Sequence, residues 1–235
     1  MSGLTQQERY EKNLNFFGAI VRSLSHQLAN VMAILTELTG LQEDILYAAE
    51  QGTPLDPARV ENIVGRMNKQ LERGTGYIKQ LNRFGHSVDY PRTTMEAGEI
   101  FERVVAYSRR FAELKKMTLT HSRPETEIPM EGSPFDLQHV LYRCLDAALC
   151  ASDQGAELTV ALEAADGGAR VILSGQATQA GEEVTSRLTM ARQLVEGVGG
   201  KLDAAADPDK PLSLIMSLPA SLRSLSAGPK QENQT

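Results

Sequence analysis

Apolar residues at alternating steps of four and three constrain the fold of this chain more than any other feature. The first series runs from Phe17 to Ile45, with one polar member: Phe17, Val21, Leu24, Leu28, Val31, Leu35, Leu38, Gln42 and Ile45. Such heptad spacing predicts a long helix that packs in a bundle or coiled coil. A second series follows the connector 51–57: Val60, Val64, Met67, Leu71, Gly74, Ile78 and Leu81. So short a connector makes the two helices antiparallel neighbours.

A single hairpin of this kind has only two apolar stripes and cannot close a core alone. Two copies give a four-helix bundle, so we expect a homodimer. We assign residues 17–88 to the hairpin and residues 1–16 to a helical extension before it.

His26 lies on the face of the first predicted helix that points away from the seam. Counted in heptads, His26 falls at position f and Asn30 at position c, one turn apart on the outer face. An exposed imidazole is accessible to another protein and is a possible nucleophile. A solvated surface histidine without a function would have the same spacing. The spacing alone therefore does not distinguish a functional histidine from a solvated one.

The segment Ser25-His26-Gln27-Leu28-Ala29-Asn30 resembles the H-box of two-component sensor histidine kinases. The resemblance implies that His26 accepts phosphate and that Asn30 positions water or the phosphoryl group. Gln27 and Arg22 would flank the docking surface of a response regulator receiver domain, although Arg22 is equally well explained as a solvated helix charge. In the family an acid usually follows the histidine and accepts its proton. Gln27 cannot do this, so the chain departs here from a self-phosphorylating kinase.

The second half of the chain predicts an α+β sandwich over residues 92–220, in which helices cover one face of a mixed sheet. Helices are expected over 99–117, from the capping Ser133 onward, and over 183–196. Strands are expected over 118–121, 127–130, 158–162, 169–173, 201–205 and 212–218. The polar residues 221–235 are expected to be a disordered tail.

This order of elements resembles the ATP-binding domain that follows the hairpin in the same family. Residues 137–152 are similar to its N-box helix, and residues 188–202 to the helix after its ATP lid. The nucleotide contacts are replaced, however. Arg143 and Ala147 stand for the asparagines that hold magnesium, Ser174 for the aspartate that binds adenine, and a segment with Arg187 for the glycine-rich lid. A hard cation takes oxygen ligands, and alanine supplies none. We therefore expect ATP and magnesium binding to be weak or absent, and no other cofactor.

Composition narrows the class further. The formal net charge is −6 without a basic cluster, which argues against a nucleic acid partner. No apolar run approaches the roughly 20 residues that cross a bilayer, so we expect a soluble, cytoplasmic protein. Cys144 and Cys150 are expected to be buried, reduced thiols. The four histidines share no ligand spacing, and no metal site is expected.

These observations favour a dimeric phosphotransfer or phosphatase module for a response regulator, derived from the histidine-kinase family. Two alternatives stay open. One is an active ATP-dependent autokinase whose pocket has diverged, which leaves it undecided whether the chain is an enzyme. The other is a dimeric interaction module that sequesters a regulator and transfers nothing.

Overall fold

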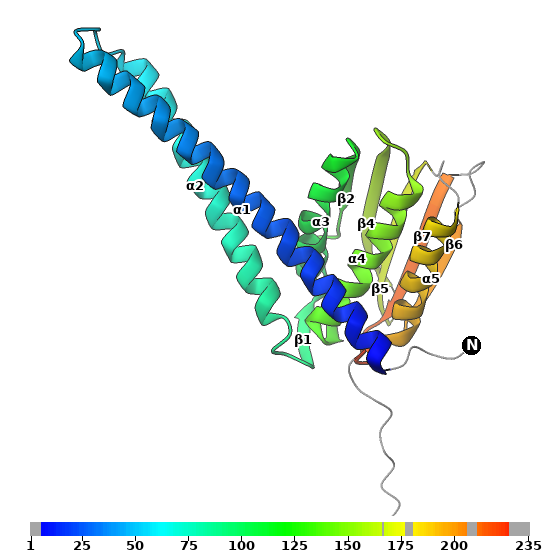
Figure 1. Ribbon diagram of the computed structural model, residues 1–235. Coiled ribbons are helices and arrows are strands. Elements are labelled where there is room, and N and C mark those ends of the chain that lie inside the picture. Colours follow the sequence, from blue (N-terminus) through cyan, green and yellow to red (C-terminus); the bar gives the residue numbers. More distant parts are fainter. Residues whose placement is uncertain (1–5, 166, 177–180, 206–210, 226–235) are drawn as a thin grey trace, which may run out of the picture. The chain divides into compact units, whose positions relative to one another are not determined.

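The computed structural model describes residues 6–165, 167–176, 181–205 and 211–225. The chain divides into two compact units. Residues 18–85 form one, and residues 1–17 together with 86–235 form the other. The predicted fold class, a helical hairpin followed by an α+β domain with a mixed sheet, is confirmed (Figure 1).

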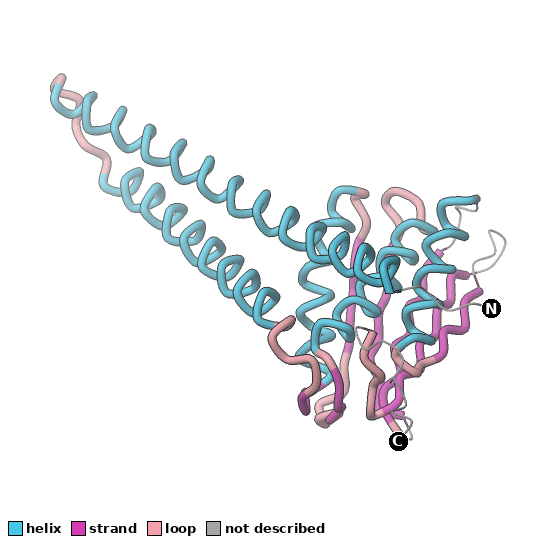
Figure 2. Tube along the Cα trace, turned by 60° about the horizontal axis from the view of Figure 1, so that its bottom comes forward, coloured by secondary structure: helices cyan, strands magenta, loops and turns pink. Residues whose placement is uncertain are grey.

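The hairpin consists of α1 (Gln6–Glu50) and α2 (Pro57–His86), which lie side by side (Figure 2). Its core is a cluster of Leu38, Ile45 and Ile63, against which further apolar residues pack: Ile34, Leu41, Val60 and Met67. The absence of a side chain at Gly74 brings the helices close, because a Cβ there would lie 3.2 Å from Val31 Cγ1. This contact fixes the register of α1 against α2.

The second unit contains the remaining elements. These are β1 (Thr93–Glu96), α3 (Ala97–Leu114), β2 (Thr118–Ser122), β3 (Pro129–Gly132), α4 (Pro134–Ala151), β4 (Glu157–Ala165), β5 (Gly168–Gln176), α5 (Glu182–Gly197), β6 (Lys201–Ala205) and β7 (Pro211–Pro219). The main sheet has the order β2-β4-β5-β7-β6, and only β2 and β4 run parallel. Its three helices cover one face (Figure 1).

Buried and exposed residues alternate along the strands, which explains why helices cover only one face of the sheet. In β4, Leu158, Val160 and Leu162 are buried, whereas Thr159 and Glu163 are exposed. Side chains of successive strand residues point to opposite faces, so one face packs against the helices and the other meets solvent. The predicted pairing of β4 with β5 across a tight turn is confirmed as antiparallel.

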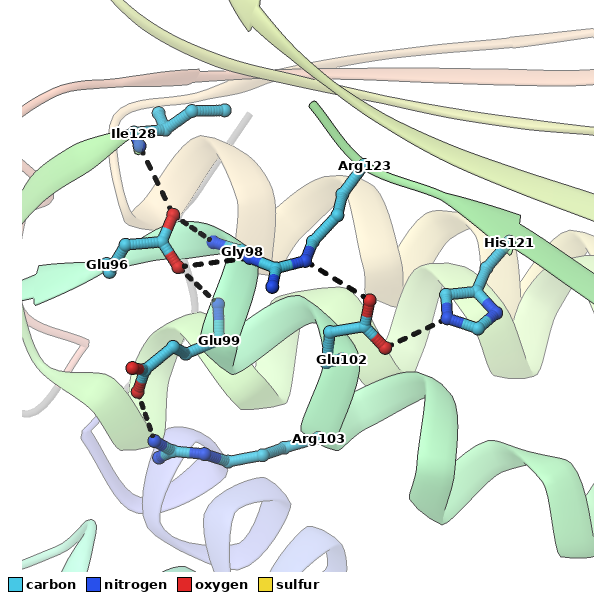
Figure 3. Close-up of polar contacts among 8 residues, drawn as sticks. All are labelled: Glu96, Gly98, Glu99, Glu102, Arg103, His121, Arg123 and Ile128. Atoms are coloured by element: carbon cyan, nitrogen blue, oxygen red, sulfur yellow. Dashed lines mark hydrogen bonds and ion pairs between the residues drawn. The ribbon is translucent and has the colours of Figure 1, made fainter. Parts of the chain in front are cut away.

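The structure differs from the sequence prediction at a small second sheet. The sequence predicts no strand over residues 93–96, yet β1 pairs antiparallel with β3. At the start of α3, the Glu96 carboxylate accepts hydrogen bonds from the backbone N–H groups of Gly98, Glu99 and Ile128. Figure 3 shows how Arg123 bridges Glu96 and Glu102, while Glu102 Oε2 lies 2.8 Å from His121 Nε2. This network ties β2 to the capped end of α3.

The expectation that residues 221–235 form a disordered tail is wrong for residues 221–225. Leu222 and Leu225 are buried, and the Leu225 N–H donates to Asp136 Oδ2 at 2.9 Å. The Leu222 N–H donates to the carbonyl of Glu131 in β3. Two leucines thus anchor a polar segment. Residues 226–235 lie outside the described residues.

Candidate functional site

His26 lies on the exposed face of α1, as the heptad pattern predicts. Arg22 and Asn30, one turn to either side of it, are also exposed, and Gln27 is half-buried. Leu24 and Val31 are buried on the opposite side of the helix. Within the described part of the chain, the imidazole of His26 makes no hydrogen bond or ion pair. The structure therefore groups an accessible imidazole with a guanidinium and a carboxamide.

The apolar rows of the hairpin differ in how far they are exposed. On α1 the buried row is Leu24, Val31, Leu38 and Ile45. On α2 an open row follows the same seven-residue spacing, with Val64, Leu71 and Ile78 exposed by 42%, 54% and 49%. Two apolar side chains of α1, Met32 and Leu46, are also exposed, by 53% and 51%. The hairpin therefore buries only part of its apolar surface within one chain.

The positions that stand for the nucleotide contacts lie on α4, β5 and α5. Ala147 is fully buried in α4 and offers no ligand atom. Arg187 on α5 donates to Asp146 and to Glu183, so its guanidinium is occupied by carboxylates of the chain. Burial raises the pKa of Asp146, although Arg187 and Arg143 favour its charged form. At these positions the structure shows a buried alanine and an ion pair between Arg187 and Asp146.

Ser174 is not part of this group. It is exposed on β5, and it does not line the cavity that Asp146 and Arg187 border. That cavity, of about 630 Å³, lies between α3, α4 and α5. Its other cation, Lys115, donates to the carbonyl of Leu149 at 2.6 Å. Both cations that border the cavity thus donate hydrogen bonds to acceptors of the chain itself.

Cys150 also lines this cavity and is half-buried, so the expectation of two buried thiols is wrong for this residue. Cys144 is buried as expected, and burial raises its pKa to about 12. Both thiols are free.

Sequence reasoning missed a contact between the start of α1 and α4, which we call the N-terminal clasp: Asn13 and Phe16 against His139. The Phe16 ring stacks on the His139 ring, with centroids 4.6 Å apart and planes at 4°. His139 Nδ1 lies 2.9 Å from Asn13 Oδ1, and Arg143 Nε donates to His139 Nε2 at 3.2 Å. These two bonds fit only the neutral ring with its proton on Nδ1.

Burial lowers the pKa of His139 to about 3, and the charges of Arg143 and Lys12 act in the same direction. His139 is completely buried, in contrast to the exposed His26. Its pairing with Asn13 joins residues 126 positions apart, and no local sequence pattern signals such a contact. The helical extension before the hairpin thus supplies core residues of the α+β unit.

The described residues contain neither a membrane span nor a metal cluster. No helix among them has the length and apolar character to cross a bilayer. In the same ranges, no group of three or more His, Cys, Asp or Glu side chains is arranged to hold a metal ion.

His86, the last residue of α2, has its Nδ1 atom 2.9 Å from Asp89 Oδ2.

No protein-family model and no curated protein matches the sequence. Among solved structures, the catalytic domain of histidine kinase ThkA is similar at 14% identity, over 56% of this chain and 99% of that one, with a TM-score of 0.48. The mycobacterial sensor histidine kinase MprB is similar at 19% identity, over 56% and 99%, with a TM-score of 0.46. Histidine kinase AdeS from Acinetobacter baumannii shows 12% identity over 81% and 97%, with a TM-score of 0.45.

All three are histidine kinases, the family that the sequence motifs resemble. At these identities and scores the likeness is one of fold and says nothing of activity. What this chain does has to be argued from its own residues.

Proposed function

We propose that this chain is a histidine-phosphotransfer protein of two-component signal transduction, in which His26 exchanges a phosphoryl group with the receiver domain of a response regulator. The observation that carries the proposal is the exposed His26, with Arg22 and Asn30 on neighbouring turns of an otherwise regular helix. A cation beside the imidazole favours the approach of phosphate. The carboxamide of Asn30 would orient the phosphoryl group or a water molecule.

Phosphotransfer of this kind requires less of the chain than autophosphorylation does. The imidazole nitrogen attacks phosphorus, the bond from phosphorus to the receiver's carboxylate breaks, and the carboxylate leaves as an anion. The chain needs no nucleotide and no base next to His26, which agrees with Gln27 at that position. The buried Ala147 and the Arg187–Asp146 ion pair support the loss of ATP binding.

We also propose that the working form is a homodimer. The open row Val64, Leu71 and Ile78 on α2 continues for two heptads, and Met32 and Leu46 are exposed on α1. Exposed apolar rows of this length mark an interaction site, and a second copy of the hairpin covers them with a matching seven-residue period. A four-helix bundle with two outward-facing His26 side chains is the expected assembly.

The test is a labelling experiment on the full chain and on His26→Ala. We expect no label from ATP with magnesium, and a His26-dependent label when phosphorylated receiver domains are the donors. A His26-dependent label from ATP would instead show an active autokinase. Receiver domains could also bind the chain and transfer no label to the wild type or to His26→Ala. In that case the chain is a sequestering module and the proposed transfer is wrong.

A further inference from the structure

Three arginines on α2 follow the seven-residue period of the hairpin. Arg59, Arg66 and Arg73 each come directly before a residue that faces α1, namely Val60, Met67 and Gly74. On α1 the residues directly before Val31, Leu38 and Ile45 are Asn30, Glu37 and Asp44. All six are exposed. In an antiparallel pair, residues one position before the facing row lie on the same side of the hairpin.

The register pairs these two rows across the hairpin. Gly74 packs against Val31, which places Arg73 beside Asn30. One heptad further along, Arg66 lies beside Glu37, and after another heptad Arg59 lies beside Asp44. Two of the three arginines therefore have a carboxylate across the hairpin, at more than the 4 Å of an ion pair, whereas Arg73 has a neutral carboxamide. Of the three, the uncompensated cation is the one nearest His26.

The side chain of Arg73 extends along α2 toward the level of His26. A helical side chain normally leans toward the N-terminus of its own helix, which for Arg73 is away from His26. Here Arg73 Nη2 donates to Tyr77 Oη at 3.5 Å, so the guanidinium extends toward the C-terminal turn instead. From the Gly74–Val31 register and a rise of about 1.5 Å per residue, Tyr77 lies within about 3 Å of the level of His26 along the hairpin axis.

Most described arginines of the α+β unit are paired with acids. Six of them have a carboxylate within 4 Å: Arg92, Arg103, Arg110, Arg123, Arg143 and Arg187. In the described hairpin, neither Arg73 nor its counterparts at 59 and 66 have one. A guanidinium presents a planar set of donors that matches phosphate oxygens. Left without a carboxylate, it is available to an incoming anion.

We propose that Arg73 binds the phosphoryl group during transfer at His26, a role that rests on the proposed function. The imidazole nitrogen of His26 forms the bond to phosphorus as the bond to the receiver's carboxylate oxygen breaks. Arg73 donates hydrogen bonds to the equatorial phosphoryl oxygens from across the hairpin and neither gains nor loses a proton. Asn30 completes the site from α1. The site therefore draws on both helices.

The test compares Arg73→Ala with Arg66→Ala and Arg59→Ala, which remove the same side chain at the same heptad position. By the rise per residue, Arg66 and Arg59 lie about 20 Å and about 30 Å along the axis from His26, against about 9 Å for Arg73. Two donors are used: potassium phosphoramidate, and a panel of receiver domains phosphorylated with labelled acetyl phosphate. The rate of His26 phosphorylation is measured, and His26→Ala gives the background.

We expect Arg73→Ala to slow phosphorylation about 10- to 100-fold with both donors, as for loss of a charge-assisted hydrogen bond. Arg73→Lys should recover part of the rate, and Arg66→Ala and Arg59→Ala should stay within about twofold of the wild type. Because all three arginines are exposed, circular dichroism should show unchanged folding.

Two results overturn the role of Arg73 alone: equal rates for Arg73→Ala and Arg66→Ala, or a loss seen with receiver domains but not with phosphoramidate. The second would make Arg73 a contact to the partner protein. In both cases His26 of the wild type is still phosphorylated, and the proposed function stands. A wild type that accepts phosphate from neither donor overturns both proposals.

Discussion

Two buried groups in the α+β unit should give this protein pH responses of opposite sign. His139 is kept neutral, with its pKa lowered to about 3 by burial and then by Arg143 and Lys12. Asp136 is also buried, which raises its pKa to about 6 even though the Leu225 N–H and Ser133 bond to it. Both shifts affect stability, because the unfolded chain titrates near the ordinary values of 6.5 and 3.8.

The two signs follow from which state binds the proton. For His139, the contribution is fully present above the unfolded pKa and falls as the pH drops toward the folded pKa, because the unfolded chain takes up a proton first. Between pH 7 and pH 5 this costs about 2 kcal/mol. For Asp136 the folded chain takes up the proton first, so the same pH change stabilises the fold by about 1 kcal/mol. The two contributions have opposite signs, and the wild type shows only their difference.

Replacing His139 or Asp136 alone reveals the pH dependence of stability that the other group offsets in the wild type. We expect that His139→Gln, relative to the wild type, will retain about 2 kcal/mol more stability when the pH falls from 7 to 5. Asp136→Asn should lose about 1 kcal/mol more than the wild type over the same range. Urea titrations at both pH values, followed by circular dichroism, give these differences, and other carboxylates cancel in the comparison. If both variants change with pH as the wild type does, the argument from burial is wrong.

Three further predictions concern packing. Leu71→Glu should convert the proposed dimer to monomer in light scattering, whereas Asn62→Glu, which adds the same charge at an exposed polar position of α2, should leave it intact. Gly74→Leu should destabilise the hairpin by about 1–3 kcal/mol in thermal unfolding, because its Cβ meets Val31 at 3.2 Å, while Gly76→Leu, which meets nothing within 4 Å, should not. Gly98→Ala should cost about 1 kcal/mol by disrupting the Glu96 cap, since its Cβ would lie 2.7 Å from Arg123 Nη1, and a gain in stability from helix propensity would contradict this.

The features that sequence predicts well here are periodic or local. The heptads predict both helices of the hairpin, and Ser133-Pro134 predicts the start of α4, where the Asp136 N–H donates to Ser133 Oγ at 3.2 Å. Alternating residues on either side of a tight turn predict the β4–β5 pair. In each case the residues that decide the structure are neighbours along the chain. Their preferences act before any tertiary contact forms.

The features that sequence misses depend on contacts between distant segments. β1 has four residues, too few for an alternating pattern, and becomes a strand by pairing with β3. Residues 221–225 are polar in composition, but Leu222 and Leu225 find sites beside Gly132 and Gly197, where a Cβ on either glycine would lie 2.8 Å from the leucine. In the sequence, His139 is one of four histidines that share no spacing. Only the structure shows that Asn13 and Phe16 contact it.

The phosphoryl site that we propose is predictable from the sequence only on its α1 side. His26, Arg22 and Asn30 lie within nine residues of one helix, so their common face follows from the heptad alone. The contribution of α2 depends on the register between two helices, and a shift of one heptad would put Arg66 or Gln80 beside Asn30 instead. The Gly74–Val31 contact marks that register, because a Cβ at position 74 would lie 3.2 Å from Val31 Cγ1 and would press the helices apart. The residue that aligns the helices therefore also decides which arginine faces the phosphoryl site, and its substitution should disturb transfer even where the hairpin still folds.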